Sequence, residues 1–356
     1  MNNMSMIKLR NYFYSSVKIV KSCSLGAFLI LISFCNPSDS KNNNETKKTI
    51  LGSTDSNFYN IANSGIAYRH YEESSLSNNS KFPYDLTNPA TIYKLPEYLK
   101  EISGVSYYKK DKIACIQDEK ANIYILNLEN EKIVSKDNFG GDADYEDIAV
   151  VGKTAFVLRN SGEIYKIEKF KDKDRKVKKY KTPLSGKNDT EGLAFDLVTN
   201  SLFIACKGSP SIDKENIYKG YKAIYRFDLE EKKLIKTPHF LIDLKNIDTF
   251  RDNSNFTKIS IKIAKKLLLI KNEVSFSPSG IAIHPFLNEI YIISSIKKML
   301  MVLDRNGKVL DLKNLDNKLF LQPEGICFSP QGDLFISNEG RGGKGYILKF
   351  NYLKNE

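Results

Sequence analysis

Five short segments of the sequence share an acid or a serine, then a small residue, then an apolar run. They are ISGVSYY (102–108), YEDIAVV (145–151), TEGLAFD (190–196), PSGIAIH (278–284) and PEGICFS (323–329). The position before the glycine, or before Asp147 in the second segment, holds Ser103, Glu146, Glu191, Ser279 and Glu324. Converging carboxylates repel one another, and a hard cation such as calcium relieves that repulsion by taking oxygen ligands. If the fold gathers these segments, we expect the three glutamates to hold calcium, assisted by the two serine hydroxyls.

A second group of acids stands two residues before the first. Its members are Glu101, Asp144 and Asp189. Acids in such positions commonly cap turns or form salt bridges, and we expect that role for most of them. We keep Glu101 as a further candidate metal ligand, and Asp144 and Asp189 as polar residues of the same region.

The spacing of the five segments indicates the elements that must position these side chains. The marker residues Gly104, Asp147, Gly192, Gly280 and Gly325 are 43, 45, 88 and 45 positions apart. A repeat of about 44 residues with several short strands in each copy is typical of a β-propeller blade. We therefore expect an all-β fold, a five-bladed β-propeller, in which each marker begins an innermost strand and glycine permits close backbone approach.

The gap of 88 positions leaves six blades as an alternative. The third copy already contains four strand-like runs by Leu244, so we expect 245–277 to be an insertion over one face. The last copy has only three strands, and TIYKLP (91–96) can supply the fourth and close the ring. The propeller is then expected to occupy 89–356.

The ends of the second strands carry another set of polar residues. They are Asp118, Glu119, Arg159, Asn160, Lys207, Ser294, Ser295, Asn338 and Glu339. We expect these residues to point toward the channel, where they line a polar pocket or form hydrogen bonds between blades.

Residues 1–35 predict export. Four basic residues precede the apolar stretch LGAFLILISF (25–34), which is too short to span a bilayer. Cys35 follows directly, as in a bacterial lipoprotein signal whose cysteine is lipidated, although Phe34 stands where a small residue is usual. Residues 36–88 are polar and are expected to form a tether. This pattern favours a membrane-anchored protein of the cell envelope, facing the periplasm or the surface.

The formal net charge of +12 comes mostly from lysine. The densest basic run, 169–181, alternates with aspartates and lacks interleaved aromatic stacking residues, so we expect a solvated loop or hairpin and no nucleic-acid partner. Cys115, Cys206 and Cys327 lie in apolar runs without C-x-x-C spacing. We expect them to be buried free thiols.

Several longer motifs in order resemble one known family. They are LPEYLKEISGVSY, GDADYEDIAVV, NDTEGLAFD, LFIACKG, PSGIAIHP and QPEGICFSPQGDLFISNEG. Together they are similar to the SdiA-regulated family of bacterial propellers, itself distantly similar to NHL-repeat propellers. The resemblance implies five blades, a bound calcium ion and no assigned biochemical activity.

Two functions remain open from the sequence. The first is a calcium-stabilised binding or scaffold module that takes an unidentified ligand or protein at its channel face. The second is a calcium-dependent hydrolase of the lactonase or esterase kind, in which the metal polarises a carbonyl. The chain has three histidines, His70, His239 and His284, none with an obvious acidic partner, and no G-x-S-x-G motif. These absences favour the binding module.

Overall fold

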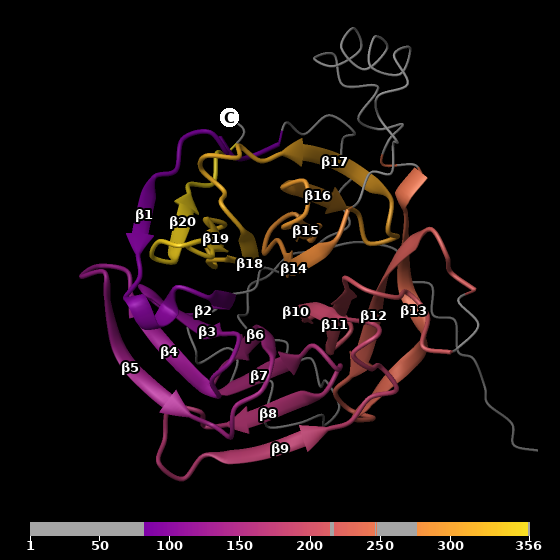
Figure 1. The fold of residues 1–356 in the computed structure, drawn as a ribbon, viewed down its shortest axis with the longest axis horizontal. Coiled ribbons are helices and arrows are strands. Elements are labelled where there is room, and N and C mark those ends of the chain that lie inside the picture. Colours follow the sequence, from indigo (N-terminus) through magenta and orange to yellow (C-terminus); the bar gives the residue numbers. More distant parts are fainter. Residues whose placement is uncertain (1–81, 214–216, 246, 248–275, 355–356) are drawn as a thin grey trace, which may run out of the picture. The chain divides into compact units, whose positions relative to one another are not determined.

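The computed structural model describes residues 82–213, 217–245, 247 and 276–354. The described strands form five four-stranded antiparallel sheets arranged in a ring (Figure 1). Each sheet is one blade, so the five-bladed β-propeller predicted from the repeat is confirmed. The predicted export signal, most of the tether and most of the 245–277 insertion lie outside the described residues.

The strands of each blade run outward from the channel in chain order. Blade 1 contains β2 (Ile102–Lys109), β3 (Lys112–Gln117), β4 (Asn122–Asn127) and β5 (Lys132–Asn138). Blade 2 contains β6 (Tyr145–Val151), β7 (Thr154–Arg159), β8 (Ile164–Glu168) and β9 (Lys176–Tyr180). Blade 3 contains β10 (Thr190–Asp196), β11 (Ser201–Cys206), β12 (Tyr221–Asp228) and β13 (Lys233–Asp243). Blade 4 contains β14 (Pro278–Ile283), β15 (Ile290–Ser294), β16 (Met299–Leu303) and β17 (Val309–Asn314).

Blade 5 joins the two ends of the propeller. It contains β18 (Pro323–Phe328), β19 (Leu334–Asn338), β20 (Tyr346–Phe350) and, as its outer strand, β1 (Thr91–Lys94). Thr91 pairs with Lys349 and Lys94 with Tyr346, and a short 3₁₀ helix, η1 (Glu97–Leu99), leads into blade 1. The predicted closure by the segment before the first copy is therefore confirmed, and no edge of β20 is left open.

The marker glycines lie where neighbouring inner strands approach closely. A Cβ on Gly104 would come within 2.5 Å of the Cα of Asp147, and one on Gly325 within 2.6 Å of the carbonyl oxygen of Ser103. Real Cβ atoms do not make such contacts, so each side chain would push two blades apart. The repeated glycine is thus required by backbone crowding at the channel.

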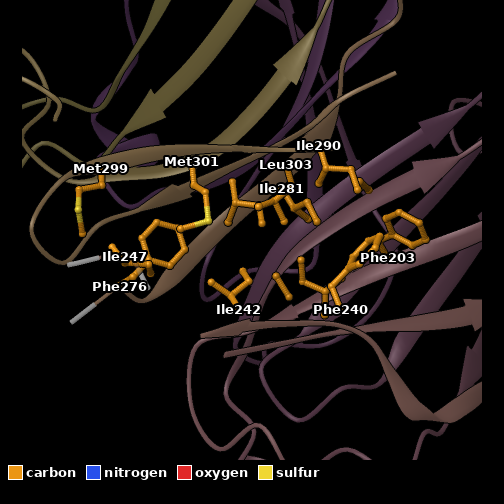
Figure 2. Close-up of a cluster of buried hydrophobic side chains, with 14 residues drawn as sticks. Phe203, Phe240, Ile242, Ile247, Phe276, Ile281, Ile290, Met299, Met301 and Leu303 are labelled. Atoms are coloured by element: carbon orange, nitrogen blue, oxygen red, sulfur yellow. The ribbon is translucent and has the colours of Figure 1, made fainter. Parts of the chain in front are cut away.

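Apolar side chains fill the spaces between adjacent blades. Figure 2 shows one such cluster between blades 3 and 4, where Phe203 and Phe240 lie near Ile281. Ile247 and Phe276, which flank the undescribed part of the insertion, are also buried in this cluster. Both residues are therefore anchored in the blade 3–blade 4 core, and burial of a side chain such as Phe276 contributes about 1.5–3 kcal/mol.

The end of the predicted tether packs against the propeller instead of standing free. Tyr84 is 5% exposed, its hydroxyl donates to the carbonyl of Gly332 at 2.6 Å, and its ring belongs to the cluster between blades 4 and 5. Leu353 donates a backbone hydrogen bond to Pro83, so the two ends of the described chain meet there. Residues from Phe82 onward therefore pack with the propeller, since Phe82 and Leu86 contact the same cluster as Tyr84.

Two smaller predictions can also be compared with the structure. Cys115, Cys206 and Cys327 are buried free thiols, as expected. The basic run contains an exposed strand, β9, which forms the outer edge of blade 2 and carries lysines that discourage edge-to-edge pairing. None of the described helices is long and apolar enough to cross a membrane.

Candidate functional site

The predicted polar residues gather at one end of the channel because of strand register. In each blade the start of the inner strand pairs with the end of the second strand, as in Pro323 with Asn338 and Tyr145 with Arg159. The residue before each marker and the residues after each second strand therefore lie at the same end of the ring. We call this end the channel mouth.

The three repeated glutamates lie close enough to influence one another's ionisation. Burial, followed by the charge of Glu191, raises the pKa of Glu146 to about 8. Burial, followed again by the charge of Glu191, raises the pKa of Glu324 well above its usual range. Burial raises the pKa of Glu191 itself to about 7. The fold therefore concentrates carboxyl groups that resist ionisation at neutral pH unless a cation compensates them.

Lys207, immediately after β11, supplies one such cation from within the chain. Its Nζ lies 2.6 Å from Oε1 of Glu191, and its charge also opposes the rise in pKa at Glu146 and Glu324. The sequence placed Lys207 only among the strand-end residues. The available signal was that a lysine stands there while blades 1 and 5 have acids at the corresponding place.

The two serines of the ring connect inner strands of neighbouring blades. The Ser103 hydroxyl donates to the carbonyl of Tyr145 at 3.0 Å, and the Ser279 hydroxyl donates to the carbonyl of Pro323 at 2.8 Å. Each serine is nearly fully buried. Their protons are thus committed to contacts between blades.

Asp147, treated in the sequence as a substitute for glycine, has a role that the sequence did not reveal. Its side chain is 1% exposed, and its two oxygens accept from the backbone amides of Leu193 at 2.7 Å and Ile148 at 2.8 Å. It therefore connects the inner strands of blades 2 and 3. Burial raises its pKa well above the usual range.

The second group of acids makes mainly local contacts. Asp144 accepts from Nδ2 of Asn160 at 3.0 Å, and Glu101 forms a 3.7 Å ion pair with its neighbour Lys100. Asp189 adopts a left-handed backbone conformation (φ 47°), and its charge raises the pKa of both Glu146 and Glu191. These contacts fit the structural role expected for this group, and Asp189 also adds to the negative charge of the mouth.

Blades 1 and 5 contribute a second set of oxygens. Burial, then the charges of Glu101 and Glu119, raises the pKa of Asp118 to about 6. Oδ1 of Asp118 and Oδ1 of Asn338 are buried and accept no hydrogen bond from any described residue. Burial and the charge of Asp118 also raise the pKa of Glu339. Two buried acceptors without donors are the kind of group that a cation or an ordered water satisfies.

The donor chemistry suits a hard cation, but the donors are not drawn together. Within the described ranges, no three Asp, Glu, His or Cys side chains lie close enough to hold one metal ion. Every acidic or amide donor at the mouth offers oxygen, which is what calcium prefers. Without a divalent ion, the carboxylates repel one another and the ammonium of Lys207 holds Glu191. Both effects keep the carboxylates from moving closer together.

The two described histidines are engaged in aromatic packing. The His239 ring lies 4.9 Å from that of Phe203, and the His284 ring lies 4.9 Å from that of Phe328. Burial lowers the pKa of His284 to about 3. Arg159, another strand-end candidate, pairs with Glu163 at 2.6 Å across its own turn.

The fold and this site define a five-bladed β-propeller with carboxyl groups concentrated at its channel mouth. The chain belongs to the SdiA-regulated family, whose family model matches residues 78–341. This match covers well over half of the sequence and confirms the resemblance seen in the repeated motifs.

Several solved structures show a weak similarity to this chain. A glutaminyl cyclase from Myxococcus xanthus matches with a TM-score of 0.47 and 10% identity, covering 75% of this chain and 97% of the other. A streptogramin B lyase matches with a TM-score of 0.42 and 12% identity, over 74% and 97% of the two chains. A comparison with curated proteins finds no match. Similarities this distant carry no argument about activity.

Proposed function

We propose that the protein is a binding or scaffold propeller of the cell envelope that holds calcium at its channel mouth. The observation that carries the proposal is that Glu146, Glu191 and Glu324 lie at the same end of three inner strands, where burial and the charge of Glu191 raise the pKa of both other glutamates. Buried carboxyl groups at close quarters destabilise a fold, and an ion that neutralises them returns that stability.

Calcium would be held by Glu146 and Glu324, with the unpaired oxygens of Asp118 and Asn338 as supporting acceptors. Glu191 would also bind the ion when its ion pair with Lys207 is broken. The ion would supply positive charge that links blades 2, 3 and 5, and it would order the face on which a ligand or protein partner docks. In this proposal the calcium ion stabilises the fold, and the face around it binds the ligand or protein partner.

Thermal unfolding with and without the ion tests this function. Chelator should lower the melting temperature and added calcium should restore it, by about 2.7 kcal/mol of stability at a hundredfold excess over Kd. Glu146→Gln and Glu324→Gln keep side-chain size and should each weaken the response, while Glu129→Gln in an exposed turn of blade 1 should not. An unchanged melt in chelator, with no metal found by elemental analysis, would refute the calcium site.

Anchoring at Cys35 is a separate part of the proposal, supported by the basic and apolar residues before it. Mass spectrometry of the mature protein should find an acylated N-terminal cysteine at position 35. An unmodified N-terminus at another residue would refute the anchor and leave export alone.

No structural observation favours the hydrolase reading over the binding module. Both described histidines pack among aromatic rings, so among the described residues a channel-mouth carboxyl is the candidate for the base of a hydrolase. The calcium proposal does not depend on such a reaction.

A further inference from the structure

A basic pocket opens beside the acids, between the loops of blades 4 and 5. Its volume is about 440 Å³, and its described lining includes Lys207, Lys297, Lys298 and Arg341, with Glu324 as the one acid among the described lining residues. Lys297 and Lys298 belong to the turn between β15 and β16, and Arg341 follows β19. Register therefore brings together cations from three blades that are far apart in sequence.

Three of these four cations lack a carboxylate partner. Among the described residues, neither Lys297, Lys298 nor Arg341 forms an ion pair, whereas Lys207 is engaged with Glu191. Nζ of Lys298 donates to the carbonyl of Asn317 at 3.1 Å. Burial and the charge of Arg341 lower the pKa of Lys298, so these cations repel each other as the pocket stands. Glu339 attracts Arg341, and Asp316 attracts Lys298, but neither pair is close enough to form an ion pair.

Hydrogen bonds position two of the groups. Nε of Arg341 donates to Oε1 of Gln322 at 2.7 Å, and Nε2 of Gln322 donates to Oε1 of Glu324 at 2.8 Å. The amide of Gln322 thus separates the guanidinium from the carboxyl and holds both. The edge of the Arg341 guanidinium that carries its two terminal nitrogens remains available to bind an oxyanion in bidentate fashion.

The backbone is strained where the unpaired cations stand. Lys297 (φ 62°), Lys298 (φ 46°) and Arg341 (φ 41°) all adopt the left-handed conformation. Each such non-glycine residue costs stability, and strain of this kind is concentrated at binding sites. Glycine or asparagine would adopt this backbone conformation at lower cost at all three positions.

We propose that this pocket binds a small organic anion through a carboxylate or phosphate group held by Arg341, Lys297 and Lys298. Ile296, which is 42% exposed and lines the same pocket, would cover the apolar part of the ligand. The described residues that line the pocket include no aromatic side chain and so offer no platform on which nucleic-acid bases stack. The site goes beyond the calcium proposal, since its ligand has the opposite charge and its cations are not the proposed metal ligands.

Isothermal titration of the full mature chain, stripped of metal by chelator, dialysed free of the chelator and kept at constant ionic strength, tests the pocket. Inorganic phosphate and succinate serve as probes, and chloride as the reference anion. Lys297→Asn combined with Lys298→Asn tolerates left-handed backbone while removing two charges, and should weaken binding of the effective probe about tenfold or more. The matched control removes the same charge from the outer side of blade 2, by Lys173→Asn with Lys181→Asn, and should leave binding unchanged.

The outcomes separate the ligand classes. Binding of phosphate alone assigns a phosphate ligand, binding of succinate alone assigns a carboxylate ligand, and binding of both supports a general oxyanion site. Failure of both probes, or an equal loss in the blade 2 control, overturns the proposal. Arg341→Gln provides a second variant if the turn double variant does not fold, and it should show the same loss. Because metal is absent throughout, failure here leaves the calcium proposal standing, and the reverse also holds.

Discussion

The ammonium of Lys207 lies 2.6 Å from Oε1 of Glu191, so a cation of the chain itself neutralises one of the three repeated glutamates. An added cation must compete with it. Lys207→Gln should therefore tighten calcium binding, by roughly tenfold, and should lower the melting temperature in chelator at pH 8 because Glu191 loses its partner. Calcium titration of both forms measures this effect. Weaker calcium binding in the variant would show that Lys207 does not compete for the site.

Stability without metal should depend on pH in a direction set by Glu146. Its pKa rises from 4.5 to about 8 on folding, so between these values the folded state keeps a proton that the unfolded chain has released. Its contribution is therefore fully present below pH 4.5 and is lost as pH rises toward 8. Melting temperatures in chelator should fall across this window, Glu146→Gln should flatten the fall, and calcium should restore more stability at pH 8 than at pH 5. A wild-type curve that rises across the window would contradict the raised pKa.

Asp147 should be worth more to stability than the glycine it replaces in the repeat. Asp147→Ala leaves the amides of Leu193 and Ile148 without their acceptor at a buried position. We expect a loss of about 1–3 kcal/mol in the free energy of unfolding. Chemical denaturation measures it, with Glu129→Ala as the exposed control. A loss no larger than that of the control would mean that other groups satisfy both amides.

Tyr84 should act as part of the propeller core. Tyr84→Ala removes a buried ring and its bond to Gly332, and we expect a cost of about 3–5 kcal/mol. Tyr84→Phe removes only the hydroxyl and should cost about 1 kcal/mol. Tyr98→Ala is the matched control, because Tyr98 is 55% exposed. Equal melting temperatures for Tyr84→Ala and the control would show that residues 82–88 belong to the tether and not to the propeller core.

The sequence by itself was enough to predict the architecture, because each blade needs the same residue pattern at the start of its inner strand and this pattern recurs at regular intervals. Inner strands crowd the channel in every blade, so the same small residue and apolar run return about every 44 positions. Counting strands in the third copy removed the sixth blade, and the unpaired TIYKLP segment predicted the closure by β1. The concentration of Glu146, Glu191 and Glu324 at one end followed from the same repetition.

Only the tertiary structure decided which polar groups meet. Lys207 reaches Glu191 within one blade, whereas the Asp147 side chain bonds across to the next blade, and neither direction is visible in residue spacing. Tyr84 packs in a cluster whose other buried members follow it by about two hundred positions or more, so its burial depends on contacts that are distant in sequence. The basic pocket is assembled from the loops of three blades. The repeat predicts where each strand lies in its blade. It does not predict which side chains meet, because that depends on how residues differ between blades at equivalent positions of the repeat.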